Sequence, residues 1–512
     1  MLRAAFVKLQ QDGVLYPSCP PFDPPEVYPE FSGVSEKDRI DKGNRIYPAV
    51  RQLLLDLGLD RERFNTILWN PLQEYVRVGG NVVIKPNLVM HRHFSGPEGL
   101  HWTITHPSVV RALIDYSWLA VGSSGTVTVV DTPLEDCDFT KLVDGSGYGD
   151  MLRDLTARGY RTEILDLRSY CSLNHLDGSN EQITLTGDPR GYTDIDLTET
   201  SMFSELEAAH GLQNYYTLGD HTVDHLDISC RTRGLPTKNH SLGRHIYRVS
   251  NTILNADLSI NVAKLKTHKF SGVTLCLKNA IGICNGKEFM PHRRPGTPTE
   301  AGDSFPNSPS LYYRWKVRRA RVLCRLIGNR LAAAIIEQIR KLIPRPLPHK
   351  GMWEPLFGDW SGNDTIWRTT VDLTNIWIKG SLITSTSAPI GRKMLCVIDG
   401  VIGMDHEGPM TGMPVNSQVL VIARDPVAAD TLGASLMGFD PEKIPTIKKA
   451  ADLHDAALGM PLSVSEAHGN VMFTAARSSF IPNRGWMSVL GVGRDDQTPK
   501  LEKREVSECE LG

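Results

Sequence analysis

The feature that most constrains the fold is a strand, a helix and a second strand that follow one another between residues 81 and 130. Residues 81–85 and 125–130 are short runs rich in valine, which are typical of strands buried on both faces. Residues 106–120 between them have helical patterning, and Pro107 suits the first turn of a helix. This succession predicts an α/β fold.

Later segments repeat the pattern. Strands are expected at residues 258–263, 393–398 and 418–423, and a helix at 426–437. Together with the first unit they predict a mostly parallel, doubly wound sheet or sheets with helices on both faces. A further helix is expected at 47–57, whereas residues 16–32 hold six prolines and read as an extended arm.

The length of 512 residues exceeds what one hydrophobic core usually serves. We therefore expect an N-terminal arm with helices (1–60), an α/β core in one or two lobes (61–294 and 358–480), a basic helical insertion or lid (295–357) and a C-terminal tail (481–512). Hydrophobic residues make up 41% and charged residues 22%, as in globular proteins.

Charge and targeting features limit the partners and the location. The formal net charge of -2 provides no global field for nucleic acid, so we expect no such partner. Lys8 interrupts the apolar start before a secretory signal could form, and no apolar run has the length of a membrane span. These features predict a cytoplasmic protein.

Nine cysteines are spread along the chain without Cys-x-x-Cys spacing. This argues against a disulfide framework, a zinc ribbon and an iron–sulfur cluster.

Charged or amide groups follow the predicted strands, where open parallel sheets bind ligands. They are Lys85-Pro-Asn87, Asp131-Thr-Pro133, Lys264-Leu-Lys266-Thr-His268, Asp399-Gly400 and Arg424-Asp425-Pro426. Aspartate and asparagine before helices are also common caps, and we expect Asp425 to be one.

The densest cluster runs from Lys264 to Gly282, with His292 ten residues further on. Lysine sits badly among apolar residues unless its ammonium group meets an anion or a covalent partner, although Lys278 would also fit a helix flank from which it reaches solvent. Histidine titrates near neutral pH and is a common metal ligand. We therefore predict His268, Lys278, His292 and Lys266 as catalytic residues, Lys85, Asn87, Lys264 and Asn279 as substrate contacts, and Asp131, Asp399 and His268 as ligands of a divalent metal.

A basic stretch lies within the predicted insertion. Its cations are interleaved with apolar residues between 314 and 330, which predicts a basic amphipathic helix; they include Arg314, Lys316, Arg318, Arg319, Arg321 and Arg325. Such a helix docks on an anionic membrane or a polyanionic glycan, or is only solvated.

Residues 358–368 combine two tryptophans with polar side chains. Tryptophan stacks on sugar rings, so Asn363, Asp364 and Arg368 are candidate substrate contacts. Trp360 and Trp367 are seven residues apart, which instead favours packing if the segment is helical.

Seven segments resemble, in order, a bacterial and archaeal family catalogued as domain of unknown function 362. They are Val83-Ile-Lys-Pro-Asn-Leu88, Thr105-His-Pro-Ser-Val-Val-Arg-Ala112, Val130-Asp-Thr-Pro133, Lys264-Leu-Lys-Thr-His268, Leu277-Lys-Asn-Ala-Ile-Gly282, Ile398-Asp-Gly400 and Asp425-Pro-Val-Ala-Ala-Asp430. Many relatives carry ferredoxin-like cysteine runs, which this sequence lacks. The family name implies no reaction.

A more distant resemblance is to the nickel-pincer lactate racemase family. His268, Lys278 and His292 are similar in order and nearly in spacing to a His, a Lys and a His of that family. There the lysine tethers a nicotinate-derived nickel cofactor, which implies a hydroxy-acid or sugar epimerase. The racemase pattern has Asp-x-Thr-Arg and Thr-His-Arg elements where this chain has Pro86-Asn87-Leu88 and Asp131-Thr132-Pro133.

Two functions remain open from the sequence. The first is a metal- or cofactor-assisted enzyme, isomerase- or oxidoreductase-like, that acts on a small anionic or hydroxylated substrate by proton or hydride transfer. The second is a non-catalytic binding or assembly protein that docks through its basic helix.

Overall fold

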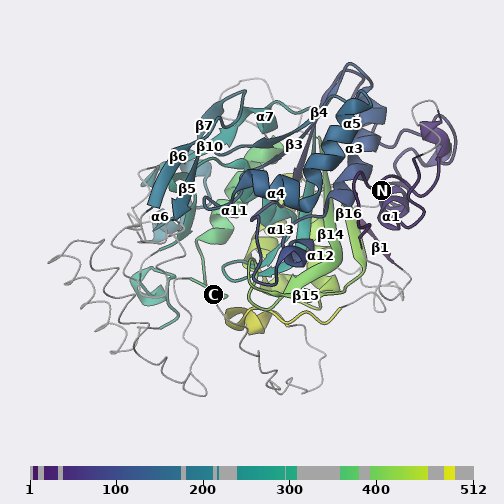
Figure 1. Ribbon diagram of the computed structural model, residues 1–512. Coiled ribbons are helices and arrows are strands. Elements are labelled where there is room, and N and C mark those ends of the chain that lie inside the picture. Colours follow the sequence, from purple (N-terminus) through teal and green to yellow (C-terminus); the bar gives the residue numbers. More distant parts are fainter. Residues whose placement is uncertain are drawn as a thin grey trace.

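The computed structural model describes residues 4–9, 16–32, 39–174, 180–210, 216–217, 239–294, 296–307, 358–379, 393–458 and 478–490. Its centre is a nine-stranded sheet in the order β1-β16-β14-β11-β2-β3-β4, with β12 beside β11 and β15 beside β14 (Figure 1). The strands are β1 (Ala4–Lys8), β2 (Asn81–Pro86), β3 (Thr126–Asp131), β4 (Thr162–Asp166), β11 (Leu258–His268), β12 (Gly272–Thr274), β14 (Lys393–Asp405), β15 (Met413–Val415) and β16 (Val419–Ala423).

Five neighbouring strands of this sheet, from β14 to β4, run parallel. Helices cover both faces, which confirms the predicted α/β class. One face carries α1 (Ile46–Asp56), α3 (Pro107–Val121) and α5 (Tyr148–Ala157). The other carries α8 (Cys276–Asn279), α11 (Ile366–Lys379), α12 (Pro426–Leu436) and α13 (Pro445–Leu458).

Smaller sheets flank the central one. They are formed by β7 (Tyr192–Asp196) with β10 (Arg244–Ser250) and β9 (His240–Ser241), by β13 (Pro291–Arg293) with β8 (Tyr216–Thr217), and by β5 (Tyr170–Asn174) with β6 (Asn180–Thr184). The other α-helices in the described part of the chain are α2 (Leu100–Thr103), α4 (Phe139–Ser146), α6 (Ser204–His210) and α7 (Asn251–Leu254).

The unit predicted between residues 81 and 130 is confirmed as β2-α3-β3. His106 caps α3, because its Nδ1 accepts a hydrogen bond from the Ser108 amide and Pro107 occupies the first turn. Val82 and Ile84 of β2 face one core, and Val83 faces the other. The strand is therefore buried on both faces, as its apolar run indicates.

Two strands are longer than predicted and one runs the other way. β11 continues to His268 and β14 to Asp405, because the hairpin strands β12 and β15 pair with their ends. β16 is antiparallel to β14, so Arg424 lies at the edge opposite the other strand ends. There it donates to Tyr75 Oη at 2.8 Å, while Asp425 caps α12 as expected.

The predicted terminal segments contribute to the core. β1, from the predicted arm, pairs with β16, and Trp486 and Val489 of the predicted tail are buried. The predicted basic helix, with Arg314, Lys316, Arg318, Arg319, Arg321 and Arg325, lies outside the described residues. Among those that are described, no helix is long and apolar enough to cross a membrane.

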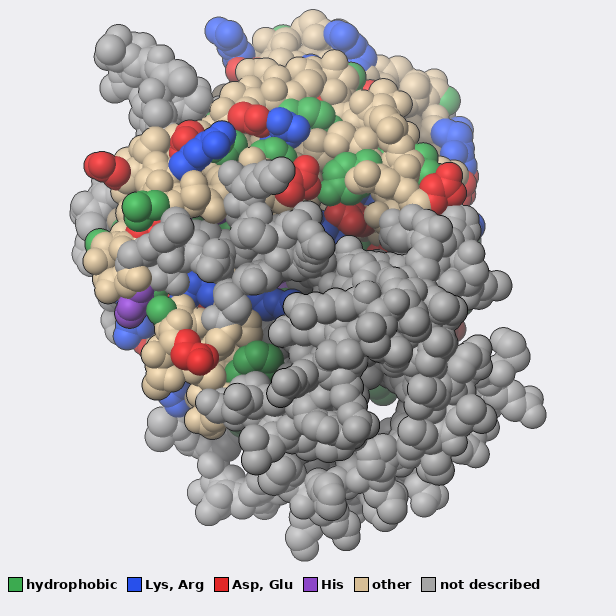
Figure 2. Space-filling view, turned by 90° about the vertical axis from the view of Figure 1, so that its left-hand side faces the viewer, with side chains coloured by type: hydrophobic (Ala, Val, Ile, Leu, Met, Phe, Trp, Pro, Cys, Tyr) green, Lys and Arg blue, Asp and Glu red, His purple; other side chains and the backbone are tan. Residues whose placement is uncertain are grey.

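The described surface mixes both signs of charge. On the face in Figure 2, basic and acidic side chains are interspersed over the described part, with small apolar areas between them. This agrees with the near-zero net charge of the whole chain.

Candidate active site

A cavity of about 660 Å³ opens at the carboxyl ends of β2, β3, β4 and β11. This volume is in the range of small-molecule sites, and its position is where α/β sheets bind ligands. The predicted residues that line it are Lys85, Asn87, Asp131, Lys266, His268, Lys278, Asn279 and His292. Five of these residues are at or just after the ends of strands in the central sheet, whereas Lys278 and Asn279 are on α8 and His292 is on β13.

One wall is a closed polar network around Lys85. Its Nζ donates to Asp131 Oδ1 at 2.7 Å and to Asn279 Oδ1 at 3.0 Å. Asp131 also accepts from the amides of Leu88 and Thr132. Because these bonds satisfy both the ammonium group and the carboxylate, Lys85 and Asp131 form a fixed wall.

Gly282 packs directly beneath this ion pair. A Cβ atom at position 282 would collide with Asp131 Oδ1 and with Lys85 Nζ. The glycine in the Leu277–Gly282 segment therefore allows the backbone to approach the pair closely.

Lys266 and Lys278 face the cavity without a carboxylate partner among the described residues. Lys266 is fully buried and donates to the Thr103 carbonyl at 2.7 Å. Burial lowers its pKa well below the usual value, and the charges of Lys264 and Lys278 lower it further. Burial also lowers the pKa of Lys278 to about 7, with a further contribution from Lys85. An anion in the cavity would stabilise both ammonium groups.

The two histidines present different tautomers when neutral. His268 Nδ1 accepts from the Phe270 amide at 3.1 Å, so a neutral ring carries its proton on Nε2. His292 Nδ1 lies 2.8 Å from the Met290 carbonyl, to which it must donate, so its lone pair is on Nε2. Burial is the main reason why the pKa of His268 lies well below its usual value, and the charges of Lys278 and Lys266 lower it further. The cavity therefore holds an imidazole donor and an imidazole acceptor.

Three buried side-chain oxygen atoms of cavity residues have no hydrogen-bond partner within the described part of the chain. They are Asn87 Oδ1, Thr132 Oγ1 and Thr274 Oγ1. Buried polar atoms are nearly always bonded to protein, water or ligand. Their grouping around one cavity supports a polar ligand there.

Lys264 and Asp399 lie elsewhere, which corrects their predicted roles. They are neighbours in register on β11 and β14, and Lys264 Nζ is 2.9 Å from Asp399 Oδ2. Tyr16 Oη donates to Asp399 Oδ1 at 2.5 Å and accepts from Lys264 at 2.8 Å. All three are buried, so they fasten the N-terminal arm to the sheet and do not line the cavity.

The predicted metal ligands do not converge. Asp131 is on β3 and Asp399 on β14, three strand spacings apart, or about 14 Å across the sheet. Each carboxylate is engaged by a lysine. Over the ranges that the structure describes, no group of three His, Cys, Asp or Glu side chains is arranged to hold a metal ion.

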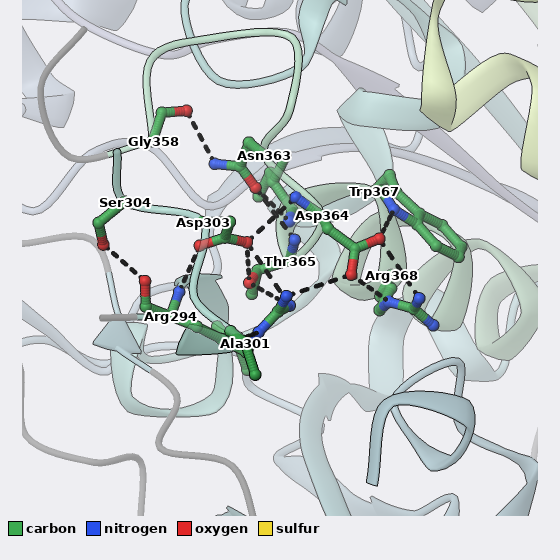
Figure 3. Close-up of polar contacts among 12 residues, drawn as sticks. Arg294, Ala301, Asp303, Ser304, Gly358, Asn363, Asp364, Thr365, Trp367 and Arg368 are labelled. Carbon is green, nitrogen blue, oxygen red and sulfur yellow. Dashed lines mark hydrogen bonds and ion pairs between the residues drawn. The ribbon is translucent and has the colours of Figure 1, made fainter. Parts of the chain in front are cut away.

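Asn363, Asp364 and Arg368 also lie outside the cavity wall. They belong to a cluster of polar contacts at the start of α11 (Figure 3). Asp364 accepts from Trp367 Nε1 and from the guanidinium groups of Arg294 and Arg368. Asn363 Oδ1 accepts from two amides at the start of α11, and its Nδ2 donates to the His292 carbonyl at 3.1 Å. Asn363 thus holds the backbone beside His292, while Asp364 and Arg368 pair with each other, and none of the three lines this cavity.

Sequence reasoning missed other parts of the lining. Glu135, Arg168 and Tyr170 follow β3 and β4, and a loop after β14 adds residues 407–411. The rule of strand ends would have found Arg168 and Tyr170 if β4 had been included, and Glu135 lies four residues after the end of β3. Gly408-Pro409 marks the turn. Glu135 forms an ion pair with Lys287 at 3.0 Å, so these two charged groups on this side of the cavity neutralise each other.

A parallel sheet with a basic, histidine-containing cavity at its strand ends defines an α/β protein with a candidate small-molecule site at the usual edge of the sheet. The model of the family described as Domain of unknown function (DUF362) matches residues 181–435. This match confirms the predicted resemblance of the chain to the family. Comparison with the curated proteins and with the solved structures found no match. The resemblance to the nickel-pincer lactate racemases therefore gains no support from these comparisons.

Proposed function

We propose that the chain is an enzyme that binds a small anionic substrate in the cavity and moves a proton on it. The observation that carries this proposal is the pairing of Lys266 and Lys278, buried without carboxylate partners, with His268 and His292 in one cavity. A carboxylate is the simplest anion that such lysines neutralise, and the unsatisfied amide and hydroxyl groups suit a carbonyl or hydroxyl beside it.

The tautomers of His268 and His292 give the two residues different roles in proton transfer. His292, with its lone pair on Nε2, removes a proton from the carbon next to the substrate carbonyl or carboxylate. The Nε2–H of neutral His268 donates to the oxygen on which negative charge develops, and Lys266 stabilises that charge. Return of the proton to the same or the opposite face gives exchange, isomerisation or epimerisation.

Solvent exchange tests this proposal without knowledge of the full reaction. The whole chain is incubated in D₂O with a panel of small 2-hydroxy and 2-oxo carboxylates, and loss of C–H signal is followed by NMR. We expect exchange on at least one compound, slowed by on the order of 10²-fold or more in His292→Gln. Lys443→Met, at an exposed lysine, is the control and should exchange like wild type. Absence of exchange throughout the panel, or full exchange in His292→Gln, contradicts the proposal.

A further inference from the structure

Lys278 is held in a rigid setting. The backbone amides of Cys276 and Leu277 donate to the Asp430 carboxylate at 2.7 and 3.0 Å, which fixes the start of α8 to α12. On its other side, Asn279 Nδ2 donates to Asn261 Oδ1 at 2.8 Å. The lysine therefore extends into the cavity from a segment that is anchored on both sides.

Three other lysines in the cavity wall have acceptors that Lys278 lacks. Lys85 contacts Asp131, Lys287 contacts Glu135, and Lys266 donates to the Thr103 carbonyl. No described residue accepts a hydrogen bond from Lys278 Nζ or forms an ion pair with it, although the side chain is only 9% exposed. A desolvated lysine of this kind is an amine nucleophile, and its pKa of about 7 leaves much of it uncharged near neutral pH.

We propose that Lys278 condenses with the carbonyl group of a small 2-oxo carboxylate and forms an imine in the cavity. This inference rests on the proposed function and names its substrate class. Lys266 lies in the same cavity and binds the carboxylate, because the negative charge of a bound carboxylate favours the ammonium form of this buried lysine. A 2-oxo acid places its carbonyl carbon one bond from that carboxylate.

The step balances with groups that line the cavity. Nζ of uncharged Lys278 attacks the carbonyl carbon, and His292 takes one proton from the nitrogen and passes it to the oxygen, to which His268 Nε2–H donates a hydrogen bond. The second N–H proton of this carbinolamine passes through His292 to the hydroxyl, which leaves as water and gives the imine. Amine and carbonyl thus become imine and water without an oxidant or a reductant, and the protonated imine acidifies the neighbouring C–H bond.

Reductive trapping tests the inference on the full chain. The protein is incubated with pyruvate, glyoxylate or 2-oxobutyrate as separate probes, with sodium cyanoborohydride, and then subjected to intact-mass measurement and peptide mapping. We expect one reduced adduct per chain on Lys278 with at least one probe. The adduct should be lost in Lys278→Arg, which keeps the charge, and retained in Lys443→Arg, at an exposed lysine outside the cavity.

Binding of the probes without reductant separates this inference from the proposed function. A probe that binds in the cavity and is never trapped, or is trapped equally on several lysines, overturns the imine while the proposed function stands. If only 2-hydroxy carboxylates bind and undergo exchange, the imine is also wrong. If no carboxylate of either panel binds, both proposals fail. Thermal unfolding of Lys278→Arg shows whether loss of the adduct reflects a chain that has not folded.

Discussion

Replacing Lys278 with methionine should stabilise the folded protein, because the native lysine is buried without a partner among the described residues. Its pKa falls from 10.5 to about 7 on folding. At ~1.4 kcal/mol for each pKa unit, the charged form is disfavoured in the folded state by about 5 kcal/mol below pH 7. Methionine has a similar length and no charge, so it removes this penalty and keeps most of the packing.

The direction of the pKa shift determines how the stability difference between Lys278→Met and wild type changes with pH. For a base whose folded pKa is depressed, the penalty is absent above the unfolded value of 10.5 and grows as the pH falls towards 7. The stability advantage of Lys278→Met should therefore be largest near pH 7 and below, and should shrink as the pH rises towards 10. Relaxation of the protein and entry of water reduce the penalty of about 5 kcal/mol. We therefore expect Lys278→Met to be more stable than wild type by about 2–4 kcal/mol at pH 7.

Thermal or urea unfolding of wild type and variant between pH 6 and pH 9.5 measures this difference. Lys287→Met serves as the control, because Lys287 is paired with Glu135 at the rim and should give no comparable gain. If Lys278→Met is no more stable than wild type at pH 7, or if its advantage does not decline with pH, Lys278 is not an uncompensated buried amine.

Three further experiments test the cavity wall, a buried carboxyl group and the basic segment. Gly282→Ala should weaken carboxylate binding at least tenfold, as measured by calorimetry, because the added methyl group would displace the ion pair of Lys85 and Asp131. Unchanged affinity would show that this ion pair is not part of the binding site. Burial raises the pKa of Asp372 to about 7, so wild-type stability should fall as pH rises from about 4 to 7, where the unfolded chain ionises first. In Asp372→Asn this fall should disappear from the pH series of unfolding midpoints, and a fall of equal size would refute the assignment. If the basic segment 314–330 docks on anionic surfaces, the chain should sediment with phosphatidylserine vesicles at low salt and less at high salt, and absence of binding at both would end the membrane hypothesis.

The sheet and its order along the chain follow from local patterns. Valine-rich runs bounded by turn residues predict β2 and β3. Apolar residues at helical spacing after His106 and Pro107 predict α3. The strand-end rule then places Asn87, Asp131 and the lysines near one edge without knowledge of the partners.

Long-range pairing decided what the sequence could not predict. Lys264 appears as a charged strand end, yet its partner Asp399 is 135 residues away, and the pair lies inside two neighbouring strands. The direction of β16 has no local signal, so the predicted position of Arg424 was wrong. Asn363 looks like a substrate contact because of its neighbours, but it supports the His292 backbone, 71 residues earlier in the chain.

The central claim is that the cavity binds a small anion through Lys266 and Lys278, and calorimetry in two buffers of different ionisation enthalpy tests it most directly. Titration of the full chain at pH 8 with the carboxylate panel should give one site, with net proton uptake, because the anion raises the depressed pKa values of both lysines. Lys266→Met should reduce the affinity at least tenfold and lower the number of protons taken up. Absence of binding throughout the panel, or binding that involves no protons and is unchanged in Lys266→Met, would contradict the claim.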